Sequence, residues 1–110
     1  MNNDEGKNNL RKYLVKKGLD FSLYGSNLIK EYIQMLMVEP DLIYNESVYT
    51  RLAHLHNRGI ETIKKCIRDS INDLCKRGII YCEKSNRNLS TKKAIIEIYN
   101  DYCEKCGIYA

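Results

Sequence analysis

The stretch that decides the fold runs from Val48 to Gly78 and reads VYTRLAHLHNRGIETIKKCIRDSINDLCKRG. It predicts two helices joined by a tight turn at residues 57–59, where Asn57 tolerates the left-handed conformation that such a turn needs. The first helix is expected to begin near residues 45–47, and the second to end where Gly78 can adopt a positive φ. Two helices joined in this way are typical of a helix-turn-helix.

The second helix of this stretch has two contrasting faces. At 100° per residue, its apolar residues fall on one narrow arc, which comprises Ile60, Ile63, Ile67, Ile71 and Leu74. The opposite arc carries Glu61, Lys64, Lys65, Arg68 and Asn72. We interpret this polar arc as a face that reads base edges in the DNA major groove. The alternative is an ordinary amphipathic hairpin whose charged face is only solvated.

The first helix of the pair carries its own apolar residues, which are Val48, Leu52, Ala53 and Leu55. Ala53 is small, as helices that cross steeply require where they approach. His56 and Arg58 are polar at positions where a helix-turn-helix often has apolar residues, and this weakens the match.

Net charge is concentrated on and after the second helix. Residues 57–93 contain ten Lys or Arg against four Asp or Glu, whereas residues 1–56 balance at seven of each. Basic side chains displace counterions from phosphates, so an excess on one side predicts a docking face for DNA. The expected phosphate contacts are Arg58, Lys84, Arg87, Lys92 and Lys93.

The composition sets outer bounds on the class of protein. A chain of 110 residues forms one domain with a core that needs no staples, here residues 9–110 behind a flexible N-terminus at 1–8. No apolar run approaches membrane-spanning length and no signal peptide is visible, so we expect a cytoplasmic protein. Five Cys without regular spacing indicate reduced thiols.

Three further helices are predicted from apolar periodicity. The first covers residues 9–17 and is closed by Gly18, the second runs from its N-cap Ser26 to Val38, and the last runs from 91 to 105 behind Ser90. Their expected buried residues are Leu10, Tyr13 and Leu14; Leu28, Ile29, Tyr32, Ile33 and Leu36; and Ala94, Ile95, Ile98, Tyr99 and Tyr102. Residues 41–44 form a short connection that could be one helical turn, residues 79–82 could be extended, and residues 83–89 form a polar loop.

Three blocks of the chain resemble the C-terminal effector domain of the master sporulation response regulator of endospore-forming Firmicutes. KGLDFSLYGSNLIKEYI resembles the family's I-G-x-P-x-x-x-x-G-Y-x-Y-L-x-E-A-I, keeping Gly18, Gly25, Ile29, Glu31 and Ile33. VYTRLA keeps Tyr49 and Ala53 of the family's L-Y-P-x-I-A. IKKCIRDSI, which leads to Arg77 and Gly78, keeps Ile67, Arg68 and Ile71 of V-E-R-A-I-R-H-A-I.

The resemblance implies an all-α, compact bundle of about five or six helices around a helix-turn-helix, in the winged-helix-like superclass. It implies sequence-specific binding of double-stranded DNA in transcription regulation, with self-association of neighbouring copies on tandem sites. In the family a phosphorylated receiver domain precedes the effector. Here the first helix follows soon after Met1, so we expect either a stand-alone effector or a fragment.

The reading face departs from the family pattern. Its Glu, Arg, Arg and His correspond to Lys64, Lys65, Arg68 and Asp69, so only Arg68 is kept. Arg bonds a guanine edge through two hydrogen bonds, whereas Lys acts as a point charge. We therefore expect that the family's DNA site is read poorly by this chain.

Other chemical constellations are weaker. Cys103 and Cys106 form a C-x-x-C, with Cys75 and Cys82 upstream, but the spacing of the upstream pair suits neither zinc nor a redox centre as simply as buried thiols. His54 and His56 point apart on a helix and are expected in solvent or in the turn. No phosphate loop, nucleophile elbow or acid–base pair is visible, so we expect no enzyme, cofactor, metal or small-molecule substrate.

A second hypothesis belongs to a different class. The chain could be a degenerate effector-like module that has lost DNA reading and mediates protein–protein interaction. Salt-dependent binding to duplex DNA separates the two hypotheses.

Overall fold

The apolar stripes of the sequence form five α-helices and one short 3₁₀ helix in the residues described by the computed structural model, 3–80 and 87–106. Side chains are described for residues 9–43, 45–80 and 91–105. The elements are α1 (Asn3–Lys17), α2 (Tyr24–Val38), η1 (Pro40–Tyr44), α3 (Ser47–His56), α4 (Ile60–Lys76) and α5 (Arg87–Cys106). No strand occurs in these two ranges, so the predicted all-α class is confirmed.

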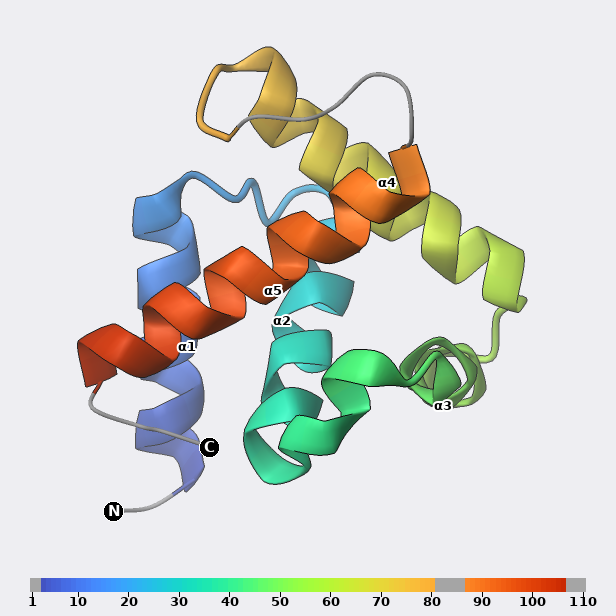
Figure 1. Cartoon of the computed structure of the whole chain (residues 1–110), viewed down its shortest axis with the longest axis horizontal. Coiled ribbons are helices and arrows are strands. Elements are labelled where there is room, and N and C mark those ends of the chain that lie inside the picture. The colour runs from blue at the N-terminus through green and yellow to red at the C-terminus, as the bar shows by residue number, and fades with distance from the viewer. Residues whose placement is uncertain (1–2, 81–86, 107–110) are drawn as a thin grey trace.

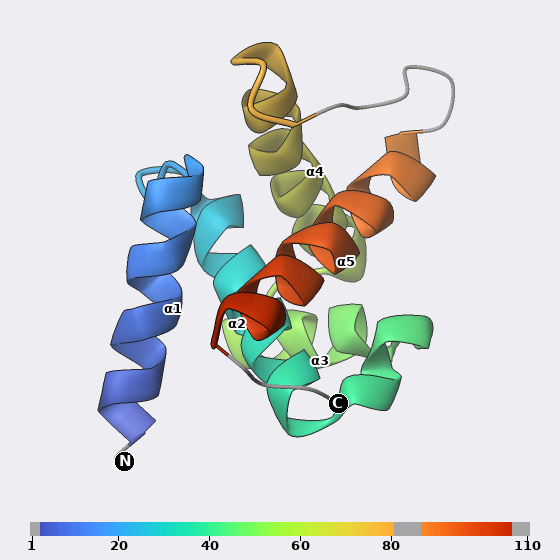
Figure 2. The same ribbon diagram turned by 60° about the vertical axis from the view of Figure 1, so that its left-hand side comes forward.

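Helix α2 lies at the centre of the bundle, with the other helices around it (Figure 1). Helix α5 crosses α2, and α1 lies to one side, as Figure 2 also shows. The predicted core of α2 is confirmed, because Leu28, Ile29, Ile33 and Leu36 are fully buried. These residues join the buried side chains of α1, α3, α4 and α5 in one apolar cluster. Burial of such a cluster supplies the main driving force for folding.

Three helices begin earlier than the sequence predicted. α1 begins at Asn3 rather than residue 9, and α5 begins at Arg87 rather than after Ser90. α2 begins at Tyr24, and its N-cap is Leu23, so the prediction that Ser26 caps the helix is wrong. Serine is a strong capping residue by composition, but here a small side chain is needed for packing against α4.

The predicted helix ends are confirmed. Positive φ occurs at Gly18 after α1, at Asn57 after α3 and at Gly78 after α4. The ends of α1 and α4 are also joined, because Arg77 donates from Nη2 to the carbonyl oxygen of Gly18 at 2.5 Å. Ile79 and Ile80 form bends rather than the expected extended run, whose other residues lie outside the described ranges, as do most of the predicted loop residues.

Two residues expected in the core are exposed. Leu55 on α3 is 65% exposed and Ile60 at the start of α4 is 40% exposed. Both lie beside the turn between the two helices, where no other element covers them. None of the described helices combines the length and the apolar character needed to cross a bilayer.

Candidate nucleic-acid interface

The turn between α3 and α4 is built as the sequence predicted. Asn57 has φ 52° and ψ 49°, and its N–H donates to the carbonyl of His54. The N–H of Arg58 donates to the carbonyl of Ala53 at 3.0 Å, which completes a Schellman motif. Gly59 is extended and serves as the N-cap of α4. The backbone therefore reverses within three residues and points α4 in a new direction.

Helices α3 and α4 cross steeply. Figure 1 shows α3 nearly end-on while α4 runs across the view. Ala53 is buried on α3 near the turn, as expected for a small residue at a close approach. On α4, the apolar arc is confirmed at Ile63, Ile67 and Ile71, which are fully buried. One face of α4 is therefore fixed against the bundle, and the other faces outward.

The outward face of α4 carries most of the predicted reading residues. Glu61 and Lys65 are exposed, and Arg68 and Asn72 are half-buried at its edge. The sequence prediction omitted three exposed residues on the same arc, namely Thr62, Asp69 and Lys76. The same 100° arithmetic places them there. The face is thus mixed in charge rather than uniformly basic.

Lys64 does not share this outward face. Its Nζ lies 3.8 Å from Oε2 of Glu46, just before α3, and 5.2 Å from the centroid of the Tyr49 ring. Burial raises the pKa of Tyr49, and the Glu46 carboxylate adds to the rise. Lys64 thus links α4 to the start of α3.

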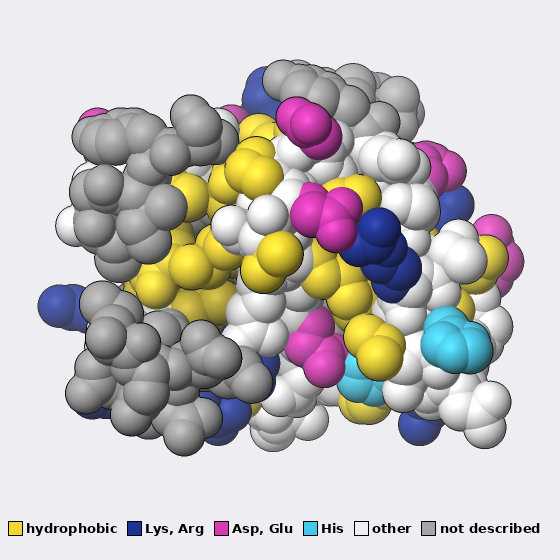
Figure 3. Space-filling model, turned by 90° about the horizontal axis from the view of Figure 1, so that it is seen from below, with side chains coloured by type: hydrophobic (Ala, Val, Ile, Leu, Met, Phe, Trp, Pro, Cys, Tyr) yellow, Lys and Arg dark blue, Asp and Glu magenta, His cyan; other side chains and the backbone are white. Residues whose placement is uncertain are grey.

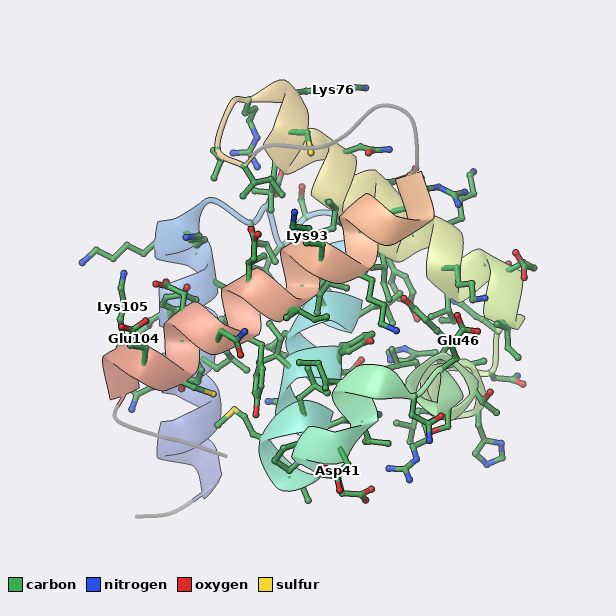
Figure 4. All side chains as sticks on the ribbon, viewed as in Figure 1. Asp41, Glu46, Lys76, Lys93, Glu104 and Lys105 are labelled. Atoms are coloured by element: carbon green, nitrogen blue, oxygen red, sulfur yellow. The ribbon has the colours of Figure 1, made fainter. Side chains whose placement is uncertain are left out.

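The predicted phosphate contacts lie on two elements. Arg58, in the turn, is exposed, and its guanidinium carbon lies 4.7 Å from the centroid of the Tyr24 ring. Lys93 on α5 is exposed and Lys92 is half-buried. Figure 4 shows Lys93 on the side of α5 toward the end of α4 that carries Lys76. Lys84 and the side chain of Arg87 lie outside what the structure describes.

His56 forms a cluster that the sequence did not reveal. It was expected in solvent or in the turn, but its Nδ1 lies 2.6 Å from the Tyr24 hydroxyl and its Nε2 lies 2.5 Å from Oε2 of Glu31. With Nε2–H donating to the carboxylate, Nδ1 of the neutral ring accepts from the hydroxyl. The cluster ties the end of α3 to α2, and the Tyr24 ring also contacts Arg58. His54, by contrast, is exposed as expected.

The cysteines differ in state. Cys66 and Cys103 are free thiols, whereas Cys75 is disulfide-bonded, so the prediction of reduced thiols throughout is wrong at Cys75. Within the described ranges, no three His, Cys, Asp or Glu side chains gather so that they could hold a metal ion.

Comparison with known proteins found no matching family, no matching curated protein and no matching solved structure. The resemblance to the sporulation effector domain therefore stands on the three sequence blocks alone.

Proposed function

We propose that this protein binds double-stranded DNA through α3, the turn and α4, and acts as a transcription regulator that resembles the sporulation effector domain. The observation that carries the proposal is the outward face of α4. It follows a tight turn, leaves a helix that crosses it steeply, and presents Lys65, Arg68 and Asn72. An α-helix with such a free polar face fits the width of the major groove.

The residues have distinct roles in this proposal. Arg68 suits a guanine, which it bonds through two hydrogen bonds, and Asn72 suits an adenine. Lys65 supplies a point charge, and Glu61 lies at the margin of the groove, where a carboxylate can accept from cytosine. Lys64 supports the reading helix from the α3 side rather than reading a base. Arg58, Lys92 and Lys93 contact phosphates, with Lys84 and Arg87 as the remaining candidates of the sequence.

The test is selection of bound sequences from a random duplex pool, followed by a salt titration on the selected duplex. We expect affinity to fall steeply with salt. Arg68→Ala relaxes preference at one base pair and costs about 1–3 kcal/mol, whereas Lys92→Ala weakens all duplexes alike. An absence of duplex binding at low salt would overturn the proposal.

A second candidate, a protein-interaction module, is favoured by one exposed apolar area. Val38 at the end of α2 is 81% exposed, and it lines a hollow of about 320 Å³ with Met35 and Leu55. Figure 3 shows this underside of the molecule, where hydrophobic side chains lie among charged ones and histidines. Exposed apolar area of this kind marks a contact surface for proteins.

The second candidate is tested by sedimentation of the protein over a range of concentrations. If this surface joins two copies, Val38→Asp abolishes the dimer while Val15→Asp, at an exposed valine of α1, leaves it intact. A monomer at all concentrations, or equal effects of both variants, would remove self-association as a role of this surface.

A further inference from the structure

A second charged site lies far along the chain from the α3–α4 turn, between α1 and α5. It is a hollow of about 370 Å³ lined by Lys12, Tyr13, Lys16, Lys17 and Lys105. Three of the lysines come from α1 and the fourth from the far end of α5. Figure 4 shows Lys105 and its neighbour Glu104 at the end of α5 that lies beside α1. The volume is within the range of pockets that hold small ligands.

Asp101 fixes the geometry of this lysine hollow. Its Oδ2 accepts a hydrogen bond from the Tyr13 hydroxyl and lies 3.9 Å from Nζ of Lys17 and 3.6 Å from Nζ of Lys105. Lys105 also lies 5.6 Å from the centroid of the Tyr13 ring. Two ammonium groups from different helices thus converge on one carboxylate oxygen. Their positions are set before any ligand arrives, which reduces the entropy lost on binding.

Positive charge exceeds negative charge around the hollow. Four ammonium groups line it, and Asp101 is the carboxylate that pairs with two of them. Lys12 and Lys16 are exposed, and neither has an ion-pair partner among the described side chains. Glu104 is the next carboxylate along α5, and it is exposed. The surplus favours a compact anion of more than one charge over a carboxylate of single charge.

We propose that the lysine hollow binds a small phosphorylated ligand that carries a diphosphate or triphosphate group. Lysine is a compact, mobile point charge that suits phosphate oxygens. Lys17 and Lys105, held by Asp101, receive the anion at the base of the hollow, and Lys12 and Lys16 close on it from α1. The site uses none of the residues assigned to DNA, so it does not depend on the function proposed above.

The experiment titrates the whole protein with inorganic pyrophosphate at physiological salt, followed by calorimetry and amide NMR shifts. We expect saturable binding, with the largest shifts in α1 and at the end of α5. Lys16→Glu weakens this binding about tenfold, since it replaces an attractive charge by a repulsive one. Lys93→Glu, at an exposed lysine of α5 remote from the hollow, changes it less than twofold. Lys12→Glu serves as a second variant in case Lys16→Glu does not fold.

The same variants distinguish the ligand from the backbone of DNA. If the hollow takes a free phosphorylated ligand, Lys16→Glu leaves duplex affinity unchanged while Lys93→Glu lowers it. Tenfold loss of duplex affinity in Lys16→Glu would overturn the proposal, because the occupant would then be DNA. Non-saturable pyrophosphate binding, or equal losses in Lys16→Glu and Lys93→Glu, would also overturn it. Loss of DNA binding in every variant would concern α4 alone.

Discussion

Gly25 lies so close to Cys66 that a Cβ on Gly25 would fall 1.9 Å from the backbone oxygen of Cys66. This is the tightest approach between α2 and α4, and the hydroxyls of Ser26 and Ser70 meet beside it at 3.4 Å. A backbone atom cannot move aside as a flexible side chain can. The position of α4 therefore depends on the missing side chain of Gly25.

Gly25→Ala is expected to destabilise the fold by about 1–3 kcal/mol or more, because α2 and α4 must separate. Gly59→Ala is the matched control, since the nearest atom to its added Cβ is 4.0 Å away and its φ is negative. Its effect should stay within about 0.5 kcal/mol. Urea denaturation measures both. Equal stability of the two variants would show that the helices adjust without cost.

His56→Ala is expected to lower the free energy of unfolding by about 1–2 kcal/mol. The substitution leaves Glu31 and Tyr24 without the imidazole that bonds both, and the carboxylate is only partly solvated. His54→Ala removes an exposed ring two residues earlier and should be nearly neutral. Thermal denaturation compares the pair, and a loss as large in the His54 variant would contradict the assignment.

Lys64 and Lys65 are neighbours in sequence but should differ in their effect on DNA. Lys65→Gln removes a charge from the outward face of α4 and is expected to weaken duplex affinity about threefold to tenfold. Lys64→Gln removes a charge already engaged by Glu46 and Tyr49, and we expect less than a twofold change. Fluorescence anisotropy with one duplex measures both. A larger effect of Lys64→Gln would mean that it leaves Glu46 to contact DNA.

Asp101 should make stability depend on acid. The hydrogen bond from Tyr13, supported by Lys105 and Lys17, lowers the pKa of Asp101. A lowered pKa in the folded state stabilises the fold above the ordinary carboxyl range, and this stabilisation is lost as the pH falls through the lowered value. Because the group is partly exposed, we expect less than about 1 kcal/mol.

Asp101→Asn should therefore be less stable than the unmodified chain at about pH 6 and nearly equal to it at about pH 2. Glu97→Gln, at an exposed residue of the same helix, should show no such convergence. Urea denaturation at the two pH values gives the comparison. A constant difference at both values would assign the effect of Asp101→Asn to packing.

The sequence predicted the parts of the fold that depend on local chemistry. Apolar periodicity located all five α-helices, and the residues that need positive φ, such as Asn57 and Gly78, marked their ends. The helix starts were predicted less well. Ser26 has the side chain of a cap, yet its role is set by Ser70, which lies 44 positions along the chain. Such contacts are invisible to a local pattern.

The candidate interface shows the same division. Helical periodicity gave the outward direction of Lys65 and the burial of Ile67, since both follow from one amphipathic helix. It could not assign Lys64, whose partners lie on and just before α3. It also missed the role of His56, because Glu31 lies 25 positions earlier. These assignments require the positions of other helices in space.

The hydrogen bond between Tyr13 and Asp101 joins residues 88 positions apart. During synthesis, α1 can meet α2 early, but this bond and the Tyr13–Tyr102 ring contact must wait until α5 has been made. Contacts so distant in sequence form late, after the loop they close has lost its conformational entropy. A nascent chain that lacks α5 therefore exposes part of the apolar stripe of α1, and until then that stripe is a surface for chaperones or for aggregation.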